Sequence, residues 1–243
     1  MATMQRIRSV LFDVWLVLWT IAVLPAIGVL ALMGSPARSV RRFTRVWMKG
    51  LVAGLKYIAG IRHQEKGRDN IPKGPCLFVA NHQSMWETIV TPLLIPDLAI
   101  VAKIELSRIP VFAWGIRSSP MIMLDRNGGA KALRAMVADS RKALADGRSI
   151  LIFPEGTRKG VAAPMEFRRG FELLYKALGV PVVPVAVNSG CRWGPELPYK
   201  MAGTITISYL PPVSPDVPST EMSETVRLAI ENERDLLARA GER

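Results

Sequence analysis

Residues that hold metal ions or form disulfide frameworks are scarce in this chain. Its 243 residues include two cysteines, Cys76 and Cys191, and two histidines, His63 and His82. Two cysteines cannot build a disulfide framework, and Cys76 lies in an apolar run typical of a buried strand, which favours a reducing compartment. The four side chains match none of the ligand spacings of metal sites. The sequence therefore predicts neither a disulfide framework nor a metal site.

Loops that bind nucleotides or carry a hydrolase nucleophile are also missing. The chain has no P-loop, no G-x-G-x-x-G and no G-x-S-x-G, and we find neither internal repeats nor low-complexity tracts. Its length suits one α/β domain with an accessory segment, long enough to bury a substantial core. Any catalytic chemistry must come from other combinations of residues.

Acidic residues are outnumbered, with 20 Asp and Glu against 32 Lys and Arg, for a net charge of +12. Residues 1–49 hold seven basic residues and one acidic residue, Asp13, which is half of that excess. These charges flank the most apolar stretch of the chain. A polybasic cluster beside an apolar helix indicates attraction to anionic lipid, so we expect membrane lipids as partners and no nucleic acid.

Residues 10–33 form a long apolar run. At about 1.5 Å per residue, a helix of this length would reach across a hydrocarbon core of roughly 30 Å. Asp13 lies near one end, where it can reach the interface, and Pro25 would kink a spanning helix or turn it into a re-entrant pair. A cleaved signal peptide is disfavoured because its apolar core would be shorter. The sequence leaves open whether the segment spans the bilayer or dips into it.

Residues 37–59 carry a two-faced helical pattern, with apolar residues at intervals of mostly three and four and basic residues between them. This is typical of a basic amphipathic helix at a bilayer surface, although the same stripe could pack against the domain. More arginines follow the apolar run than precede it, so we expect the next domain on the cytoplasmic side of the inner membrane. We assign residues 1–60 to a membrane-associated helical segment and residues 61–243 to an α/β domain.

From about residue 62 onward, strand-like and helical patterns alternate. Short apolar runs predict strands at 76–80, 98–102, 121–124, 149–153, 181–187 and 204–210, and the stretches between them predict helices near 84–94, 130–145, 168–178 and 219–240. Gly147 and Gly179 stand where helix C-caps belong. This alternation predicts an α/β fold, a mostly parallel or mixed sheet covered by helices. Pro181 and Pro184 indicate an edge position or a bulge for their strand.

A histidine and a carboxylate lie five residues apart just after the strand at 76–80. A carboxylate bonded to one ring nitrogen of His82 would fix its tautomer and leave the other nitrogen free to take a proton, and Glu87 is placed for this role. Without a Ser or Cys nucleophile, such a pair suits acyl transfer onto a substrate hydroxyl. The alternative is structural, because Ser84 and Glu87 also form S-x-x-E, a capping box for the following helix.

Four stretches resemble, in order, the motifs of the glycerolipid acyltransferases, the family that contains 1-acylglycerol-3-phosphate acyltransferase. They are Asn81–Glu87, Ile122–Arg126, Phe153–Arg158 and Val180–Val185. The first resembles the family's His-four-residues-Asp motif, which implies that His82 and Glu87 are catalytic. Glu87 stands where the family usually has Asp, which keeps the charge but adds a methylene. The fourth stretch, linked in the family to the acyl donor, has the pattern of a core strand.

Two strand ends carry groups that suit a phosphate monoester. The strands at 121–124 and 149–153 each run into an arginine, and the second also offers a hydroxyl and a glycine that permits close backbone approach. We assign Glu155 to orienting Arg158 or to accepting from a substrate hydroxyl. Lys103 lies in a segment that resembles one the family places near the acceptor phosphate. The predicted substrate-binding residues are Arg126, Glu155, Gly156, Thr157, Arg158 and Lys103.

The resemblance implies an enzyme of phospholipid biosynthesis. It would move a fatty acyl group from an acyl thioester, acyl-CoA or acyl carrier protein, to the free hydroxyl of 1-acyl-glycerol-3-phosphate and so form phosphatidate. The transfer would be direct, with no metal and no resident cofactor. Two alternatives stay open: an acyltransferase for another lyso-lipid, such as lyso-ornithine lipid, and a non-catalytic lipid-binding protein on the same fold.

Overall fold

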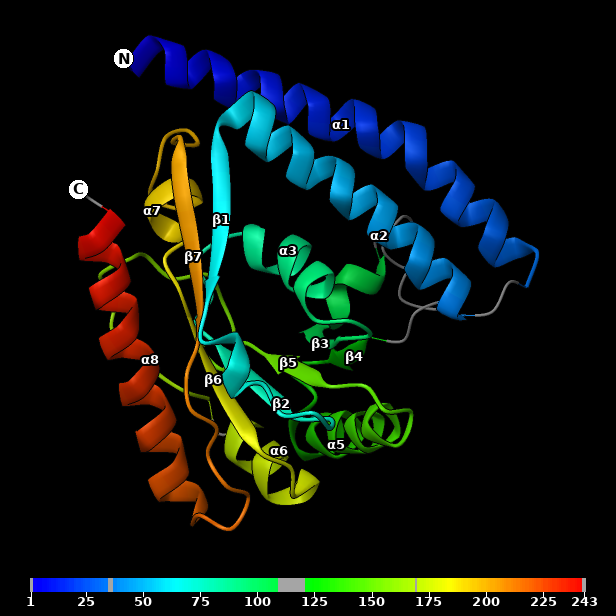
Figure 1. The fold of residues 1–243 in the computed structure, drawn as a ribbon. Helices are drawn as coiled ribbons and strands as arrows, with labels where there is room; N and C mark the ends of the chain where they lie inside the picture. The colour runs from blue at the N-terminus through cyan, green and yellow to red at the C-terminus, as the bar shows by residue number, and fades with distance from the viewer. Residues whose placement is uncertain (1, 35–36, 109–120, 169, 242–243) are drawn as a thin grey trace.

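The structure is a computed structural model that describes residues 2–34, 37–108, 121–168 and 170–241. Its described part contains a seven-stranded sheet with the order β1-β7-β6-β2-β5-β3-β4 (Figure 1). The strands are β1 (Ile61–Lys66), β2 (Leu77–Ala80), β3 (Ala99–Lys103), β4 (Ile122–Leu124), β5 (Ile150–Ile152), β6 (Val182–Val187) and β7 (Gly203–Tyr209). Neighbouring strands are parallel except β6 and β7, which are antiparallel. The predicted α/β fold with a mixed, mostly parallel sheet is confirmed.

The six predicted strands coincide with β2 to β7 to within one residue at each end. β2, β5 and β6 are buried along their whole length, because helices cover both faces of the sheet there, and such strands are continuously apolar in sequence. The prediction missed β1, a polar edge strand whose side chains alternate between buried or half-buried and exposed. It lacks the apolar run by which the other strands were recognised.

The edge position suggested by Pro181 and Pro184 is wrong, because β6 lies in the interior of the sheet between β2 and β7. Pro184 is tolerated because the ladder of β6 with β7 begins at Val185 and covers only the residues up to Val187. The backbone of Pro184 takes part in the sheet through its carbonyl, which accepts the N–H of Leu210 at 2.9 Å. The missing N–H of the proline therefore costs no strand pairing.

Helices cover both faces of the sheet. They are α1 (Ala2–Leu32), α2 (Ala37–Gly54), α3 (Trp86–Leu94), α5 (Gly129–Ala145), α6 (Gly170–Leu178), α7 (Gly190–Trp193) and α8 (Ser219–Gly241). α1, α2 and α3 pack with Phe78 on one face, whereas α5, α6 and α8 pack with Leu77 and Val79 on the other. Gly147 and Gly179 have φ values of 74° and 60° just after α5 and α6, as predicted for C-cap positions.

The two N-terminal helices form a hairpin that is fastened to the sheet domain. The predicted helices at 10–33 and 37–59 are confirmed as α1, which begins earlier, and as α2, which continues into a π-helical turn at Leu55–Ala59. Phe12 of α1 is fully buried in the same core cluster as Phe78. Asp13 pairs with Lys200 at 2.6 Å, which ties α1 to the domain, while 57% of the Asp13 side chain stays exposed. The apolar helix is thus part of the folded body.

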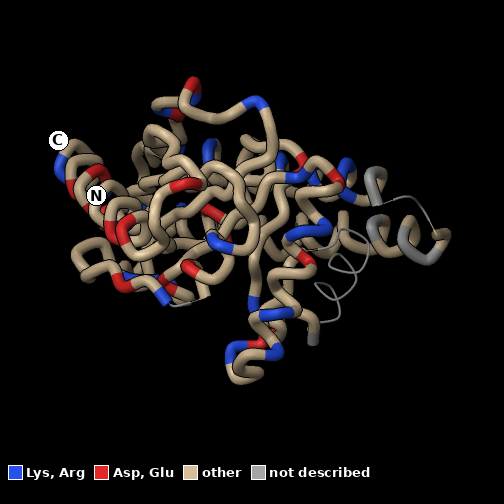
Figure 2. The backbone as a smooth tube through the Cα atoms, turned by 90° about the horizontal axis from the view of Figure 1, so that it is seen from below, with Lys and Arg blue, Asp and Glu red and all other residues tan. Residues whose placement is uncertain are grey.

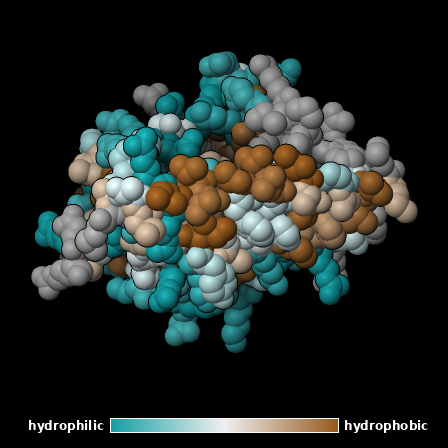
Figure 3. Space-filling model, turned by 90° about the horizontal axis from the view of Figure 1, so that it is seen from above, coloured by the Kyte–Doolittle hydropathy of each residue, from teal (hydrophilic) through white to brown (hydrophobic). Residues whose placement is uncertain are grey.

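The opposite side of α1 exposes apolar side chains. Among the described residues, α1 is the one helix long and apolar enough to cross a membrane. The large hydrophobic side chains that α1 leaves exposed are Met4, Ile7, Val10, Leu11, Val14, Val17, Leu18, Ile21 and Val29. They form much of the hydrophobic surface seen from the α1 side of the molecule (Figure 3). An apolar face of this extent is typical of a membrane contact.

Candidate active site

The predicted site residues all lie at one edge of the sheet. Four parallel strands stand side by side in the order β2-β5-β3-β4, and their carboxyl ends share that edge. His82 follows β2, the stretch from Glu155 to Arg158 follows β5, Lys103 ends β3, and Arg126 follows β4. Ligands of α/β folds bind at the carboxyl ends of parallel strands. The sheet order therefore brings together residues that are far apart in the sequence.

His82 and Glu87 form the hydrogen-bonded pair that the sequence predicted. The Nδ1 atom of His82 lies 2.9 Å from Oε2 of Glu87, which sits in the first turn of α3. The Glu87 side chain is fully buried, whereas 17% of the His82 side chain is exposed. The imidazole stacks on Phe153 with ring centroids 4.2 Å apart. Because Nδ1–H donates to the carboxylate, Nε2 is the nitrogen left to accept a proton.

The same carboxylate also caps α3. Oε2 of Glu87 accepts the N–H of Ser84 at 2.9 Å, and the hydroxyl of Ser84 accepts the N–H of Trp86 at 3.1 Å. The capping alternative and the predicted pair with His82 are therefore not exclusive, since one side chain makes both sets of contacts. The additional methylene of Glu, compared with Asp, still allows the bond to His82 to form.

Ser189 is a member of this cluster that the sequence prediction missed. It is buried just after β6, and its hydroxyl donates to Oε1 of Glu87. Both carboxylate oxygens thus have donors, which is what a buried charge requires. Ser189 follows β6, the strand that pairs with β2, and this position could have identified it. The pairing is known only from the order of the strands in the sheet.

Glu155 has a different role from the one predicted. It is 3% exposed, and its Oε2 accepts the backbone N–H of His82 at 2.7 Å. The carboxylate thus neither orients Arg158 nor stands open to a substrate. Burial raises the pKa of the Glu155 carboxyl, while the hydrogen bond from His82 opposes this shift. The backbone carbonyl of His82 accepts the N–H of Lys159 at 2.8 Å, so the loop after β5 holds His82 in place.

Neighbours of His82 in the sequence fix its loop to β6. The amide of Asn81 makes two hydrogen bonds of 2.8 Å, donating to the carbonyl of Val187 and accepting its N–H. The side-chain oxygen of Gln83 accepts the N–H of Gly190 at 3.0 Å. These bonds extend the pairing of β2 with β6 past the end of the strands, so the direction of the intervening His82 is set on both sides.

Basic side chains gather over Gly156, which has a φ of 72°. A Cβ at this position would lie 2.8 Å from Nε of Arg168, so the glycine leaves room for that side chain, while Cζ of Arg126 would stand at an ordinary contact distance of 3.5 Å. Arg168, which the prediction missed, is held by a 3.3 Å bond from its Nε to the carbonyl of Glu155. Partial burial, together with Arg168, lowers the pKa of Arg126. Two adjacent cations suit a phosphate group.

The other predicted phosphate ligands are exposed at the same edge. Thr157, Arg158 and Lys103 lie at the surface and make no side-chain hydrogen bond or ion pair within the described residues. Their charges and hydroxyl are therefore open to a ligand.

Within the described residues, no group of three or more His, Cys, Asp or Glu side chains is arranged to hold a metal ion. Burial raises the pKa of the Cys76 thiol to about 11, so it is protonated and a poor nucleophile at neutral pH.

Comparison with known proteins agrees with this geometry. Residues 62–188 match the family model described as Acyltransferase, which is more than half of the chain. The chain belongs to the acyltransferase family. The matched range contains the His82–Glu87 pair, Arg168 and all the predicted phosphate ligands, and Ser189 is the first residue beyond it.

Individual relatives extend the similarity beyond the family match. The 1-acyl-sn-glycerol-3-phosphate acyltransferase of Pseudomonas aeruginosa is 35% identical over 211 residues, covering 85% of this chain and 80% of the relative. The alpha enzyme of Mus musculus with that name is 28% identical over 192 residues, 76% of this chain and 67% of its own. The crystal structure of the 1-acyl-sn-glycerophosphate acyltransferase of Thermotoga maritima matches with a TM-score of 0.76 at 21% identity, covering 95% and 96% of the two chains. The last match includes the N-terminal hairpin in the shared fold.

Proposed function

We propose that this acyltransferase acylates the free hydroxyl of 1-acyl-sn-glycerol-3-phosphate to give phosphatidate. The observation that carries the proposal is the His82–Glu87 hydrogen bond of 2.9 Å on the strand edge that also bears the arginine cluster. A base and a phosphate site at one edge suit an acceptor that carries both a hydroxyl and a phosphate. The names of the relatives in Pseudomonas aeruginosa and Mus musculus support the same acceptor.

The base works through the free nitrogen of His82. Nε2 removes the proton of the acceptor hydroxyl as its oxygen attacks the carbonyl carbon of the acyl thioester. The buried Glu87 carboxylate stabilises the imidazolium that forms. The carbon–sulfur bond then breaks, and the imidazolium returns the proton to the leaving thiolate. No covalent acyl-enzyme is needed, and the donor is acyl-CoA or acyl carrier protein.

The phosphate of the acceptor would be held by the basic groups at the neighbouring strand ends. Arg126 and Arg168 already converge over Gly156, and Arg158 and Lys103 are exposed on the same edge. A phosphate monoester of nearly two negative charges is well matched by such a cluster. Binding the phosphate there would direct the acceptor hydroxyl toward His82 at the end of β2, the strand beside β5.

The protein would work at the membrane surface, with the sheet domain on the cytoplasmic side of the inner membrane. The rest of the chain holds α1 along its length, through Arg8 to the carbonyl of Ile58 at 2.7 Å and Trp19 to the carbonyl of Trp47 at 2.9 Å. A helix fastened in this way cannot cross the bilayer by itself, so its exposed apolar face would dip into one leaflet. This choice between spanning and dipping was open from the sequence.

An acceptor panel tests the proposal. Detergent-purified protein would be incubated with a labelled acyl thioester and with 1-acyl-glycerol-3-phosphate, lyso-ornithine lipid or other lysophospholipids. We expect thiol release and labelled phosphatidate only with 1-acyl-glycerol-3-phosphate. Transfer to lyso-ornithine lipid alone would assign another acceptor, and no acceptor-dependent thiol release would indicate a lipid-binding protein.

A further inference from the structure

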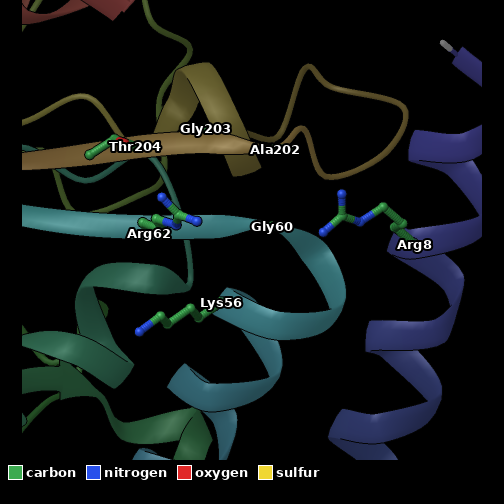
Figure 4. Close-up of a pocket in the computed structure, with 7 residues that line it drawn as sticks. All are labelled: Arg8, Lys56, Gly60, Arg62, Ala202, Gly203 and Thr204. Carbon is green, nitrogen blue, oxygen red and sulfur yellow. The ribbon is translucent and has the colours of Figure 1, made fainter.

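A basic cavity lies three strands from the catalytic pair, where α1 meets the start of β1 and β7. Because β7 is antiparallel to β6, these strand starts lie at the same edge of the sheet as the carboxyl end of β2. Its volume is about 260 Å³, and it is lined by Arg8, Lys56, Gly60, Arg62, Ala202, Gly203 and Thr204 (Figure 4). The three basic side chains come from α1, from the turn after α2 and from β1, and surround the first residues of β1 (Figure 4). The lining contains no acidic side chain.

The cations of this cavity are not neutralised by the protein. Within the described residues, no ion pair involves Arg8, Lys56 or Arg62. Arg8 is instead oriented by its bond to the carbonyl of Ile58. Like charges around a small space repel one another, and a bound anion would relieve that repulsion. The charge pattern therefore indicates an anionic ligand.

Backbone donors of the cavity are already used, so the ligand would be recognised by side chains. The N–H of Gly203 donates to the carbonyl of Gly60 at 3.0 Å, and that of Ala202 donates to the side-chain oxygen of Gln5 at 3.2 Å. The Thr204 side chain, which is paired in register with Arg62, adds a hydroxyl. Two arginines, a lysine and a hydroxyl are typical ligands of a phosphate diester.

The position of the cavity beside α1 indicates that the phosphate belongs to a membrane lipid. Arg8 lies on the domain side of α1, while Ile7 and Leu11 next to it belong to the exposed apolar face. A helix is roughly 10 Å across, and an interfacial helix is buried about 5 to 10 Å into the headgroup boundary. The cavity would therefore lie at the level of the lipid phosphates.

We propose that this cavity binds the headgroup phosphate of an anionic phospholipid of the surrounding membrane. This inference rests on the membrane position of α1 proposed above, but not on the acceptor. The site is separate from the catalytic pair, because β1 is three strands from β2 in the sheet, or about 14 Å at the usual strand spacing. Its role would be to hold the enzyme on anionic membranes in a fixed orientation.

Binding of the full-length protein to vesicles tests the proposal. We would compare vesicles of phosphatidylcholine alone with vesicles of phosphatidylcholine mixed with phosphatidylglycerol. Wild type should prefer the anionic vesicles, and Lys56→Gln with Arg62→Gln should reduce that preference by about fivefold per basic side chain removed. The matched control, Lys142→Gln with Lys176→Gln, removes the same charge from α5 and α6 and should keep the preference. Binding of wild type to phosphatidylcholine alone reports the insertion of α1, so a wrong membrane position would be detected separately.

A second variant separates a shaped site from diffuse charge attraction. Thr204→Leu fills the cavity without changing the charge and should also lose most of the preference, with Ala202→Leu as the substitute if that strand position does not tolerate Leu. Unchanged preference in a folded, cavity-filled variant, or in the Lys56 and Arg62 double variant, would overturn the proposal. Adding inorganic phosphate at constant ionic strength should leave the preference in place. Its loss would assign the cavity to a soluble phosphate instead.

Discussion

Glu87 bonds both to His82 and to the N–H of Ser84, and a substitution can separate its proposed catalytic role from its capping role. Gln at this position keeps an oxygen for the N–H of Ser84, so the cap of α3 should persist, but it removes the charge that stabilises the His82 imidazolium. We expect Glu87→Gln to lower the transfer rate by up to about 10⁴, the loss that a carboxylate-to-amide change causes in a serine protease triad, while the free energy of unfolding changes little. Urea unfolding and initial rates measure the two effects. Glu87→Asp, which restores the charge, should be partly active, and near-normal transfer by Glu87→Gln would show that the residue only caps the helix.

Glu155 supports His82 through its backbone. Glu155→Ala would leave the N–H of His82 buried without an acceptor, which we expect to cost about 1 to 3 kcal/mol of stability and to lower the rate. Glu155→Gln keeps the acceptor and should preserve both. Comparable loss in the two variants would contradict the backbone role.

The raised pKa of Glu155 also predicts a pH dependence. The folded protein holds this proton more tightly than the unfolded chain does, so its contribution to stability is complete below the ordinary pKa of Glu. That contribution is lost as the pH rises through the pKa of the folded state. Urea unfolding across this range should show wild type losing stability relative to Glu155→Gln, whereas parallel curves would argue against the shift.

Sequence patterns identified the site residues that lie close together in the chain, and they missed those that reach the site from distant segments. His82 and Glu87 are five residues apart, so their spacing is visible in the chain. Ser189 and Arg168 contact the site from other loops, and nothing in their own sequence neighbourhood identifies them. Glu155 was placed correctly at the strand end but given the wrong partner, because its partner is a backbone N–H that no sequence pattern marks.

At the scale of elements, the N-terminal hairpin depends on glycines in α2. A Cβ at Gly50 would lie 2.1 Å from the indole of Trp19, whose Nε1 donates to the carbonyl of Trp47. Gly50→Ala should therefore destabilise the protein by about 1 to 3 kcal/mol, although alanine is the better helix former. Urea unfolding in detergent measures this loss. Adding Trp19→Phe, a smaller ring that relieves the clash but loses the bond to Trp47, should recover part of the lost stability. A stabilised Gly50→Ala would contradict the packing.

Elements were predictable where burial leaves a pattern in the sequence. β2, β5 and β6 are buried on both faces and have continuous apolar runs, and α2 has one apolar stripe. β1 has a single strongly buried residue, Ile61, and pairs with β7 across a long stretch of sequence. The order of the strands depends on such distant pairings. The sequence could therefore predict that the site residues lie at the carboxyl ends of strands, but not which strands are neighbours in the sheet.

At the scale of the whole molecule, charge and apolar surface are distributed unequally. Basic positions occur on many elements with acidic positions among them (Figure 2), but half of the net excess lies in residues 1–49, beside the apolar face of α1. This arrangement favours a lipid surface as the partner of the N-terminal hairpin.

The exposed face of α1 gives a test of membrane association. Leu11 and Leu18 are 53% and 60% exposed, so Leu11→Lys with Leu18→Lys should leave the fold intact while opposing insertion of the helix. We expect much weaker binding to phosphatidylcholine vesicles in flotation experiments. The matched control, Leu228→Lys with Leu236→Lys on the exposed side of α8, should bind normally. Equal binding by both double variants would contradict the role of α1, as would release of wild type by salt alone.

Transfer of the acceptor hydroxyl proton to His82 is the central step of the proposed reaction. The most direct measurement is the initial rate of labelled acyl transfer to 1-acyl-glycerol-3-phosphate by wild type and by His82→Ala, with the free energy of unfolding determined for both. We predict a rate lower by about 10² to 10⁴ or more in a variant that is as stable as wild type. A folded His82→Ala protein that still transfers at the wild-type rate would contradict this role.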